Sequence, residues 1–501
     1  MKLSVLCDAL KSCRILSKSD PDIVGVTNDS RRTKPGGLFV AVVGYEQDGH
    51  AYVRQAIEKG AVAVVVERRV VGVSTVPQVL VRNSRDALSA LSDKFNGEPS
   101  RKLEICGVTG TKGKTTTTFL IHAISEASGC PTGMLGTIGY RFGRRHIPAT
   151  GTTPESVELH NYLAQMVEAN LRRAVVEVSS HALALSRVSH IRFRTAVLTN
   201  VMRNEHTDFH KTFAHYRASK AFLFATLKKG QVAILNRDDP SFDYFVERTG
   251  AEVISYGMCP EADIQGEVLC SSLSESVVRV KVFGRNSFEV KLRLIGNYNV
   301  SNLLAASGAA LAMGAPESAI QRGLETLSQV PGRLEPVNCG QDYTVLVDYA
   351  HTADSLHSVL KTLRAVAKRR LIVLFGCGGN RDKTKRPLMG RAASTGADFT
   401  WITSDNSRNE KTKDIINQIK KGLVSRAEHQ ICHDRAGAIR GAIEMAAPGD
   451  IVLLAGKGHE TYQILGDITY PFDDRIVARE AILNRMDRES RHGRFSSVAA
   501  L

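Results

Sequence analysis

The stretch Gly110-Thr111-Lys112-Gly113-Lys114-Thr115-Thr116 joins two segments with different patterns. Before it, residues 103–108 form an apolar run that predicts a strand. After it, residues 119–127 carry apolar side chains at helical spacing. A glycine loop between a strand and a helix points backbone N–H groups and the positive end of the helix dipole at one spot. Because this context is met on both sides, the stretch predicts a site for a polyphosphate, although Val108 stands where the full phosphate-loop pattern has glycine.

Polar side chains that could complete this site follow the loop and two further strands. Lys114 would lie along the β- and γ-phosphates, and Thr115 would offer its hydroxyl to Mg²⁺. The apolar runs 174–178 and 196–200 predict strands that lead into polar residues. In open α/β sheets ligands gather beyond the carboxyl ends of the strands, where oxygen ligands suit Mg²⁺ bound to phosphates. The residues expected to converge there are Glu177, His181, His206 and Asp208.

The length and composition indicate a soluble protein of several domains. Its 501 residues predict about three domains, from a prior of roughly 150 residues each. With 43% hydrophobic and 23% charged residues, the chain has the composition of a globular protein. No apolar run suits a signal peptide or reaches the ~18 residues of a membrane helix, so we expect a cytoplasmic protein without a membrane partner. The nine cysteines include no C-x-x-C pair, which favours reduced, mostly buried thiols over disulfides or zinc.

The net charge of +15 has two interpretations. It could mark a protein that binds nucleic acid, or it could favour any anionic ligand. The basic residues are dispersed apart from short clusters such as Lys368-Arg369-Arg370, and no aromatic residues interleave with these clusters. We therefore expect small anionic substrates and no nucleic-acid partner. A basic phosphate-loop ATPase that acts on nucleic acid is the alternative.

The order of the predicted elements indicates an α/β fold with three domains. Residues 1–98 predict a smaller α/β domain, and residues 99–330 predict a central phosphate-loop domain with a mostly parallel sheet. In residues 331–501, four apolar strands each end in a polar or glycine-rich loop. Their alternation with helices predicts a doubly wound, Rossmann-like sheet with its site at the strand C-termini. No G-x-G-x-x-G follows these strands, so a dinucleotide cofactor is not expected. The polar tail after Asn484 predicts a frayed terminus.

Motifs spread over nearly the whole chain resemble those of the Mur ligase family in their order and spacing. The resemblance is strongest to the branch that makes UDP-N-acetylmuramoyl-tripeptide. It implies that the N-terminal domain binds the UDP substrate, the central domain ATP, and the C-terminal domain an amino acid. The motifs are Asp29-Ser30-Arg31 with Pro35-Gly36, Gly110 to Thr116, Thr152-Thr153-Pro154-Glu155, Glu177 to Leu183, Tyr216 to Lys220, Asn299 and Asn302, Pro331-Gly332-Arg333, Asp348 to Thr352, Gly378 to Arg381, Asp405 to Arg408, and Gly456 to Glu460.

The resemblance implies an ATP-driven amide ligation, and we expect a monomer that acts on small molecules. In the family, ATP phosphorylates the C-terminal carboxylate of UDP-MurNAc-L-Ala-D-Glu, and an incoming diamino acid attacks the acyl phosphate. A carboxylate is a poor electrophile, so phosphorylation supplies a leaving group, and the negative charge that develops requires cations. Lys220 matches the lysine that the family carbamylates to N6-carboxylysine, which turns a cation into an anion able to hold a second Mg²⁺.

The resemblance also assigns residues to each substrate. Lys114, Lys220 and His206 would be catalytic, and Thr115, Glu177 and carbamylated Lys220 would hold the metal. The ATP site would consist of Gly110, Thr111, Lys112, Gly113, Lys114, Thr115 and Thr116, with Asn302, Arg333 and Asp348 around the adenosine. The UDP-sugar substrate would contact Ser30, Thr152, Thr153, Ser179 and Arg187. The incoming amino acid would contact Arg381, Asp405, Asn406, Arg408, Gly456 and Glu460.

The loop from Asp405 to Arg408 bears on which diamino acid is used. Family members that use meso-diaminopimelate carry Asp-Asn-Pro-Arg, whereas the third residue here is Ser407. Arg408 can bind a terminal carboxylate bidentately, and lysine or ornithine would leave it unpaired. meso-Diaminopimelate is therefore the expected substrate, with L-ornithine or L-lysine as alternatives. A folylpolyglutamate synthetase-like ligase is a further alternative, which the motifs around Asp405 and Glu460 disfavour.

Overall fold

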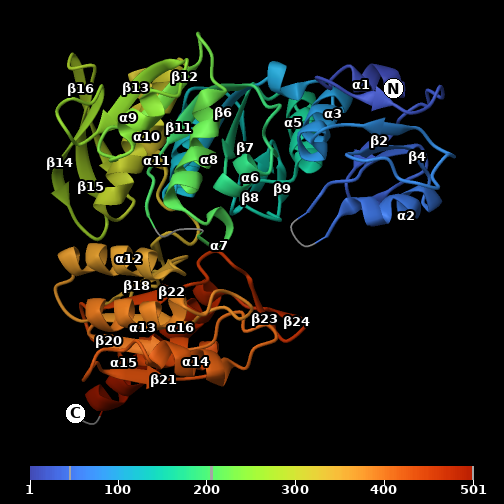
Figure 1. Ribbon diagram of the computed structural model, residues 1–501. Coiled ribbons are helices and arrows are strands. Elements are labelled where there is room, and N and C mark those ends of the chain that lie inside the picture. The colour runs from blue at the N-terminus through green and yellow to red at the C-terminus, as the bar shows by residue number, and fades with distance from the viewer. Residues whose placement is uncertain (45–46, 204–206, 499–501) are drawn as a thin grey trace. The chain divides into compact units, whose positions relative to one another are not determined.

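The computed structural model describes residues 1–44, 47–203 and 207–498, and its contacts divide the chain into two compact units (Figure 1). The first unit contains an N-terminal sheet and a central sheet, and the second contains one large sheet and a β-hairpin. The first unit comprises Met1–Val268, Val278–Val290 and Tyr298–Thr326. The second unit comprises Leu269–Val277, Lys291–Asn297 and the chain from Leu327 on.

The N-terminal sheet has the strand order β1-β5-β4-β3-β2. Its strands β2 to β5 pair in parallel, and β1 pairs antiparallel with β5. The sequence of β4, AVAVVV, has no polar alternation, as expected of a strand that is covered on both faces. Its elements are α1 (Leu3–Cys7), β1 (Arg14–Ile15), β2 (Gly25–Thr27), β3 (Gly37–Val40), α2 (Val53–Glu58), β4 (Ala61–Val66), β5 (Gln78–Leu80) and α3 (Ser84–Phe95), with 3₁₀ turns at Ser30–Arg32, Gly49–Tyr52 and Pro99–Arg101.

The central sheet places the strand before the phosphate loop between two parallel neighbours. Its order among the described residues is β16-β15-β14-β13-β12-β11-β6-β10-β7-β8-β9. Strands β7, β10, β6, β11, β12, β13 and β14 pair in parallel, which confirms the predicted mostly parallel sheet. Because parallel strands end at the same edge, the loops after β6, β7, β10 and β11 are brought together. At one end of the sheet, β8 and β9 add antiparallel strands.

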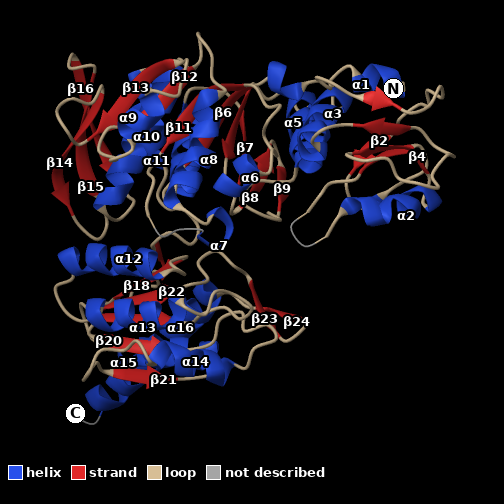
Figure 2. Ribbon diagram, in the orientation of Figure 1, coloured by secondary structure: helices blue, strands red, loops and turns tan. Residues whose placement is uncertain are grey.

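The helices of the central domain lie beside this sheet (Figure 2). The strands are β6 (Glu104–Thr109), β7 (Thr132–Gly136), β8 (Gly139–Phe142), β9 (Arg145–Ile147), β10 (Arg173–Glu177), β11 (Phe193–Leu198), β12 (Val232–Asn236), β13 (Glu252–Gly257), β14 (Ile264–Ser271), β15 (Ser276–Val282) and β16 (Asn286–Leu292). The helices are α4 (Lys114–Ala127), α5 (Ser156–Glu168), α6 (Ser180–Ala184), α7 (Thr207–His210), α8 (Phe213–Ala225), α9 (Phe242–Val246), α10 (Asn297–Ala312) and α11 (Glu317–Thr326).

The sheet of the second unit has the order β17-β18-β22-β19-β20-β21 and helices on both faces. Along β19, Leu371, Val373 and Phe375 face a core that also contains residues of α12, α13 and α14, whereas Ile372 and Leu374 face α15 and α16. Alternate residues of β19 therefore face opposite sides of the sheet, and both sides are apolar. This is typical of a doubly wound sheet with helices on both faces, which confirms the predicted fold of this region. The four predicted strands are β18, β19, β20 and β22, and they pair in parallel.

The bounds of these elements complete the chain. The strands are β17 (Glu335–Pro336), β18 (Thr344–Asp348), β19 (Leu371–Phe375), β20 (Phe399–Ile402), β21 (His429–Ile431), β22 (Ile451–Ala455), β23 (Tyr462–Leu465) and β24 (Ile468–Pro471). The helices are α12 (Ala353–Val366), α13 (Lys385–Gly396), α14 (Thr412–Lys420), α15 (Arg435–Met445) and α16 (Asp474–Val498). All nine cysteines are free thiols, but the prediction that most of them are buried is wrong, because only Cys7, Cys106 and Cys377 are buried. Among the described residues, none of the helices combines the length and apolar character needed to cross a bilayer.

The prediction of a frayed terminus after Asn484 is wrong, because α16 continues to Val498. Arg485 donates from Nη1 to the carbonyl oxygens of Ile443 at 2.6 Å and Ala446 at 2.8 Å, at the end of α15. The last carbonyls of a helix lack partners within that helix, so a nearby arginine stabilises them. A polar segment therefore forms a helix here through contacts that its own composition does not reveal.

Candidate functional site

The phosphate loop connects β6 to α4 as predicted, and two lysines meet at its first glycine. Gly113, the residue before α4, has a φ of +86°, and a Cβ atom there would collide with Oδ1 of Asn302. Both the left-handed backbone and the close contact require glycine. Lys114 Nζ donates to the Gly110 carbonyl oxygen at 2.9 Å, and the fully buried Lys220 donates to the same oxygen at 2.9 Å. The structure thus brings both lysines to the head of the helix, where an anion binds favourably.

Three polar side chains hold the loop in place. The Asn200 side chain accepts the N–H of Lys112 at 2.9 Å, and the Thr111 hydroxyl lies 2.9 Å from the Tyr216 hydroxyl. Thr111 also accepts the N–H of Met202 at 2.9 Å. Residues from the end of β11 and from α8 therefore fix the loop from one side, which keeps its backbone N–H groups in one arrangement.

Glu177, at the end of β10, is the buried carboxylate of this site. One of its oxygens, Oε2, accepts hydrogen bonds from the hydroxyls of Thr115 at 3.1 Å and Thr137 at 3.0 Å. Its other oxygen, Oε1, accepts the N–H of Thr137 at 2.9 Å. The predicted pair Thr115 and Glu177 is therefore in direct contact, at the N-terminus of α4.

Asn302 of α10 also lies beside the phosphate loop. Its Oδ1 accepts a hydrogen bond from Thr117 Oγ1 at 3.3 Å, and its amide donates to Asn299 at 2.9 Å. A residue nearly 200 positions further along the chain is therefore packed against α4, as its assignment to the ATP site requires.

Four of the five residues assigned to the UDP-sugar substrate form one chain of contacts that reaches Glu177. The Thr152 hydroxyl lies 3.1 Å from the Thr137 hydroxyl, within hydrogen-bond distance. Thr153 Oγ1 donates to the Glu177 carbonyl oxygen at 2.7 Å and lies 3.3 Å from Ser179 Oγ. Arg187 donates to the Thr153 carbonyl oxygen at 3.2 Å. These residues therefore surround the carboxyl end of β10.

Ser30, the fifth residue of that set, is not in contact with the other four. It is buried in the N-terminal domain, where its hydroxyl donates to Gln55 at 2.6 Å. Next to it lies a cavity of about 490 Å³ that its neighbours Asp29 and Arg32 line. The cavity also includes residues of α5 and of the turn before it, namely Glu155, Val157 and Glu158. It therefore lies between the N-terminal sheet and the central domain, within the first unit.

In the second unit, the loops after β20 and β22 bring together most of the predicted amino-acid site. Asn406 donates from its amide to Glu460 at 2.9 Å. Lys457, which is fully buried, donates to Glu460 Oε2 at 2.9 Å and to Asn406 Oδ1 at 3.2 Å. A Cβ at Gly456, where φ is +108°, would lie 3.1 Å from the Asp405 carboxylate. The four predicted residues Asp405, Asn406, Gly456 and Glu460 thus form one cluster around the Lys457 ammonium.

The backbone holds Arg408 in an uncommon conformation. Its φ is +48°, in the left-handed region. Two hydrogen bonds with the β23–β24 hairpin secure it: Arg408 N–H donates to Ile464 O at 3.2 Å, and Gly466 N–H donates to Arg408 O at 2.9 Å. Its Nη1 donates to the carbonyl oxygens of Gly379 at 3.0 Å and Asn406 at 3.3 Å. The hairpin therefore determines where this guanidinium lies.

Arg381 is exposed and belongs to the same loop region. A Cβ at Gly378 would lie 3.2 Å from Arg408 Nη1 and 3.7 Å from Arg381 Cγ, so both arginines flank this glycine. A side chain at that position would be in tight contact with the Arg408 guanidinium and in ordinary van der Waals contact with Arg381.

Two more fully buried cations fix the loops below the site. Arg386 binds Glu410 through two hydrogen bonds of 2.9 Å and donates to the Gly378 carbonyl oxygen at 3.1 Å. Arg435 pairs with the buried Asp474 at 2.6 Å and donates to the carbonyl oxygens of Ser404 at 3.2 Å and Ala455 at 3.0 Å. The arginines therefore tie together the ends of β19, β20 and β22.

The charges in this region keep its carboxylates ionised. Burial by itself raises the pKa of Asp405, but the charges of Lys457 and Arg435 and the N–H of Asn406 outweigh it and hold that pKa below its usual value. The hydrogen bonds from Arg386 lower the pKa of Glu410 to about 2. Asp405 is therefore an anion at neutral pH and can bind an ammonium group.

Arg333 and Asp348, assigned to the adenosine, lie close to this cluster within the second unit. Asp348 accepts the N–H groups of Leu334 and Ala350, both at 2.8 Å, and its carbonyl oxygen accepts the N–H of Gly456 at 3.0 Å. The Arg333 guanidinium lies 5.1 Å from the centre of the Tyr349 ring. The Asp348 side chain thus stabilises the loop around it, and its carbonyl oxygen contacts the amino-acid site at Gly456.

Comparisons with known proteins agree with this geometry. The sequence matches the "Mur ligase family, catalytic domain" over residues 22–96, the "Mur ligase middle domain" over residues 108–310, and the "Mur ligase, glutamate ligase domain" over residues 332–458. It is 43% identical over 492 residues to the UDP-N-acetylmuramoyl-L-alanyl-D-glutamate--2,6-diaminopimelate ligase of Geobacillus thermodenitrificans, which covers 97% of this chain and 100% of the relative. The chain belongs to the Mur ligase family. It is accordingly an enzyme of the ligase class.

Solved structures of Mur ligases and their neighbours share the fold. A structure of a UDP-N-acetylmuramoyl-L-alanyl-D-glutamate--2,6-diaminopimelate ligase superposes with a TM-score of 0.68 and 32% identity, over 93% of this chain and 95% of that one. A folylpolyglutamate synthase from Thermotoga maritima superposes with a TM-score of 0.58 but only 17% identity, over 74% of this chain and 89% of that one. At that identity the second likeness shows a common fold and nothing further.

Sequence reasoning missed several residues of this Mur ligase's site. Thr137 follows directly on β7 and contacts Glu177, and Asn200 follows β11 and holds the phosphate loop. Both residues follow a strand of the parallel sheet, and this position could have predicted that they belong to the site. Lys457 was visible between two glycines after β22, but its burial was not. Arg386 gave no signal, because it lies within a helix and its partner Glu410 is 24 residues away.

The oxygen atoms at the head of α4 fit a magnesium ion bound together with a nucleotide. Thr115 and Glu177 supply a hydroxyl and a carboxylate, the hard donors that Mg²⁺ prefers. Within the ranges that the structure describes, no group of three or more His, Cys, Asp or Glu side chains could hold a metal ion by itself. Phosphate oxygens and water would therefore complete the coordination. His206, predicted to join this site, lies outside the described residues.

Proposed function

We propose that this Mur ligase joins meso-diaminopimelate to the D-Glu carboxylate of UDP-MurNAc-L-Ala-D-Glu, with ATP hydrolysed to ADP, in the synthesis of peptidoglycan precursors. The 43% identity over the full length of a relative named for this reaction supports the proposal. We further propose that the enzyme works in the cytoplasm as a monomer on these small molecules. The Arg408 guanidinium is the single observation that carries the choice of diamino acid.

The free edge of Arg408 favours a substrate whose side chain ends in a carboxylate. A guanidinium has five N–H donors, and the hydrogen bonds that Arg408 makes within the described residues both leave from Nη1. The Nε and Nη2 donors could then bind a carboxylate bidentately. Asp405 and Glu460 would take ammonium groups. meso-Diaminopimelate has a carboxylate and an ammonium at both ends, whereas lysine and ornithine end in an ammonium alone.

Lys114 and the phosphate loop would act on the first step. ATP transfers its γ-phosphoryl group to the D-Glu carboxylate, which forms an acyl phosphate and releases ADP. Lys114 and the N–H groups at the head of α4 would stabilise the charge that develops on the phosphoryl oxygens. Bound Mg²⁺, held by Thr115 and Glu177, would add Lewis-acid stabilisation of the same charge. The amine of the diamino acid then attacks the acyl carbon and displaces phosphate, which leaves an amide.

Lys220 would serve this site as a carbamate. Its ammonium is fully buried and lies 2.9 Å from the Gly110 carbonyl oxygen, so a carboxylate built on it would lie beside the phosphate loop. We expect Lys220→Ala to be nearly inactive and to recover part of its activity when small carboxylates are added. Full activity of the variant without any addition would remove the carbamate role.

ADP release with a panel of amino acids tests the proposed reaction. We expect release to require both UDP-MurNAc-L-Ala-D-Glu and a diamino acid, and to be fastest with meso-diaminopimelate. Faster release with L-ornithine or L-lysine would change the amino acid but keep the ligation. Release with a reduced folate and glutamate, or with DNA or RNA alone, would replace the proposal by one of those activities, and no release with any pair would end it.

Arg408→Ala sharpens the choice of amino acid. We expect the KM for meso-diaminopimelate to rise by roughly 10- to 100-fold, as for loss of a charged hydrogen-bonding partner, while the KM for ATP stays constant. Arg391→Ala is the matched control, since Arg391 is an exposed arginine of α13. An unchanged KM in Arg408→Ala would move the specificity towards ornithine or lysine.

A further inference from the structure

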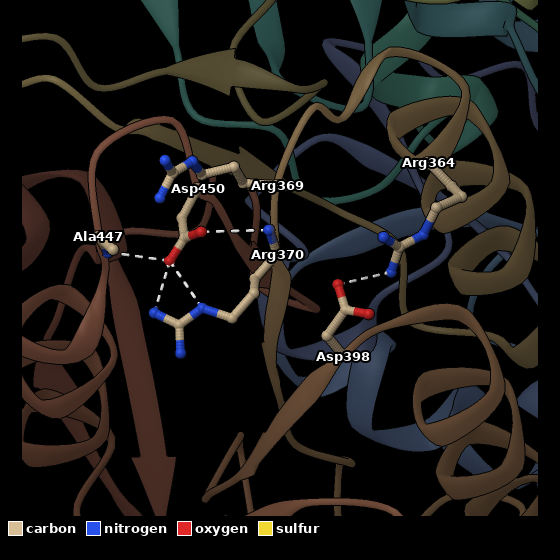
Figure 3. Close-up of a pocket in the computed structure, with 6 residues that line it drawn as sticks. All are labelled: Arg364, Arg369, Arg370, Asp398, Ala447 and Asp450. Atoms are coloured by element: carbon tan, nitrogen blue, oxygen red, sulfur yellow. Dashed lines mark hydrogen bonds and ion pairs between the residues drawn. The ribbon is translucent and has the colours of Figure 1, made fainter.

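A basic cavity lies at the edge of the second unit's sheet opposite to the amino-acid site. It measures about 430 Å³, and it is lined by Arg364, Arg369, Arg370, Asp398, Ala447 and Asp450 (Figure 3). Arg370, Asp398 and Asp450 directly precede β19, β20 and β22. The same three strands end in the loops that carry Arg381, Arg408 and Glu460. Strands of four or five residues separate the two edges by roughly 15 Å, so the cavity is not part of the site described above.

The two aspartates of the cavity are already engaged. Asp398 accepts Arg364 at 2.8 Å and the N–H of Leu371 at 2.7 Å. Asp450, which is buried, accepts Arg370 at 2.7 Å and the N–H groups of Ala447 at 2.8 Å and of Arg370 at 3.1 Å. Each carboxylate therefore holds one arginine in a fixed orientation, as Figure 3 shows. The paired arginines keep 43% and 45% of their side chains exposed, so they can still donate outward.

Arg369 adds a third guanidinium without a matching acid. No hydrogen bond or ion pair of its side chain is found in the described part of the chain. A Cβ at Gly449 would come within 3.4 Å of Arg369 Cδ, so the arginine stem packs along that glycine. Three guanidinium groups face two carboxylates, which leaves the cavity with an excess positive charge. Lys368, adjacent in sequence, is exposed and does not line the cavity.

We propose that this cavity binds a phosphate group, either free inorganic phosphate or the phosphate of a small monoester. Arginine forks match the geometry of a phosphate, and guanidiniums that are already oriented lose little entropy when they bind. The two aspartates favour a small anion that contacts only the arginines. A larger polyanion would also approach the aspartate carboxylates and be repelled by their negative charge. The cavity has the volume of a small-ligand site.

The single tryptophan of the chain reports on this cavity. Trp401 Nε1 donates to Met445 Sδ at 3.1 Å, and the Met445 carbonyl oxygen accepts Arg370 Nη2 at 2.9 Å. An anion that binds the Arg370 guanidinium should therefore change the surroundings of the Trp401 indole through Met445. Intrinsic fluorescence of the intact protein can follow binding without a label.

The test is a fluorescence titration of the full chain with inorganic phosphate and, separately, with glycerol phosphate. Sodium chloride at matched ionic strength is the reference. We expect a saturable change with a Kd on the order of 1 mM. Saturation with both compounds would identify the site as one for phosphate monoesters, and saturation with inorganic phosphate alone would identify it as one for the free ion. A response identical to that of chloride would overturn the proposal.

Two variants separate the cavity from general charge and from the ATP site. Arg369→Gln should weaken the apparent affinity at least 5-fold, whereas Lys368→Gln, which removes the same charge from the neighbouring exposed residue, should leave it unchanged. Arg369 is exposed, so its replacement should not disturb folding, which circular dichroism checks. The titration should also persist in Lys114→Ala. Equal weakening in both glutamine variants, or loss of the response in Lys114→Ala, would assign the signal to net charge or to the phosphate loop and contradict the proposal.

Discussion

The cations of the phosphate loop and those of the amino-acid site are held by different partners. In the central domain, Lys114 and Lys220 both donate to the carbonyl oxygen of Gly110. In the second unit, the buried Lys457, Arg386 and Arg435 each bind a carboxylate, from Glu460, Glu410 and Asp474 respectively. The shared partner of the two lysines is a backbone carbonyl next to the N-terminus of a helix, whereas the partners in the second unit are side-chain carboxylates.

This difference indicates what each region does with its charge. Lys114 lies at the N-terminus of α4, where backbone N–H groups and the helix dipole favour an anion with several negative charges. A buried cation that is paired with an acid contributes little net field, and it instead fixes the positions of the loops that it joins. The first region is therefore built to neutralise a ligand, and the second to hold recognition groups in a set geometry. The following variants test this distinction.

Lys114→Ala should have the largest effect, a loss of ligation of about 10³-fold or more, because a charge that stabilises the phosphoryl group is removed. ADP release with saturating substrates measures it. Lys229→Ala, which removes an exposed lysine from the turn after α8, is the control and should retain full activity. Turnover close to that of the unmodified enzyme in Lys114→Ala would contradict the role of this region as the neutralising one.

Lys457→Met should act on recognition and leave the ATP site intact. Without the ammonium, Glu460 loses its ion pair, and Asn406 Oδ1 loses one of its two donors and keeps the Ile464 N–H at 2.9 Å. We expect the KM for the diamino acid to rise by about 10- to 100-fold, as for truncation of one partner of a buried charge pair, with the KM for ATP unchanged.

The control for this variant is Lys420→Met, an exposed lysine at the end of α14. Urea unfolding of both proteins should show that the second unit remains folded. A parallel rise of both KM values in Lys457→Met would mean that the buried lysine serves the whole active site and not the amino-acid loops alone.

Glu410→Gln should have the smallest effect, on stability and not on chemistry. Arg386 is fully buried but keeps hydrogen bonds to Gln418 and to the Gly378 carbonyl oxygen, so the loss of its charged partner should cost about 2 kcal/mol at pH 7. The pKa of Glu410 in the folded protein is about 2, below the ordinary value of 4.5. The carboxylate therefore contributes stability above pH 4.5, and this contribution is lost as the pH falls towards 2.

Urea unfolding followed by Trp401 fluorescence at several pH values measures this dependence. The difference in stability between the unmodified protein and Glu410→Gln should be full at pH 7 and shrink below pH 4.5. Glu428→Gln, at an exposed glutamate, should show no such difference. A gap that stays constant down to pH 3 would mean that Glu410 acts through shape and not through charge.

Much of the fold could be predicted from local patterns. The runs before Gly110 and before the loops at Asp348, Gly376, Ser404 and Gly456 are all strands, because consecutive apolar residues flanked by glycine and polar residues suit a strand buried on both faces. The loop at Gly110 and the contact of Thr115 with Glu177 followed from the rule that ligands gather at strand ends. The helix after Asn484 could not be predicted, since Arg485 is secured by carbonyls of a different helix.

The sequence by itself determined the order of strands and helices, the phosphate loop and the family, because these depend on residues that are neighbours along the chain. Only the tertiary structure decided that Lys457 is buried between Asn406 and Glu460, that Arg386 and Arg435 lie beneath the loops, and that a basic cavity opens at the far edge of the sheet. These features join residues that are separated by up to 80 positions, as in the pair Arg370 and Asp450. A side chain's burial and partner are set by packing between elements, and a periodic pattern within one element does not specify them.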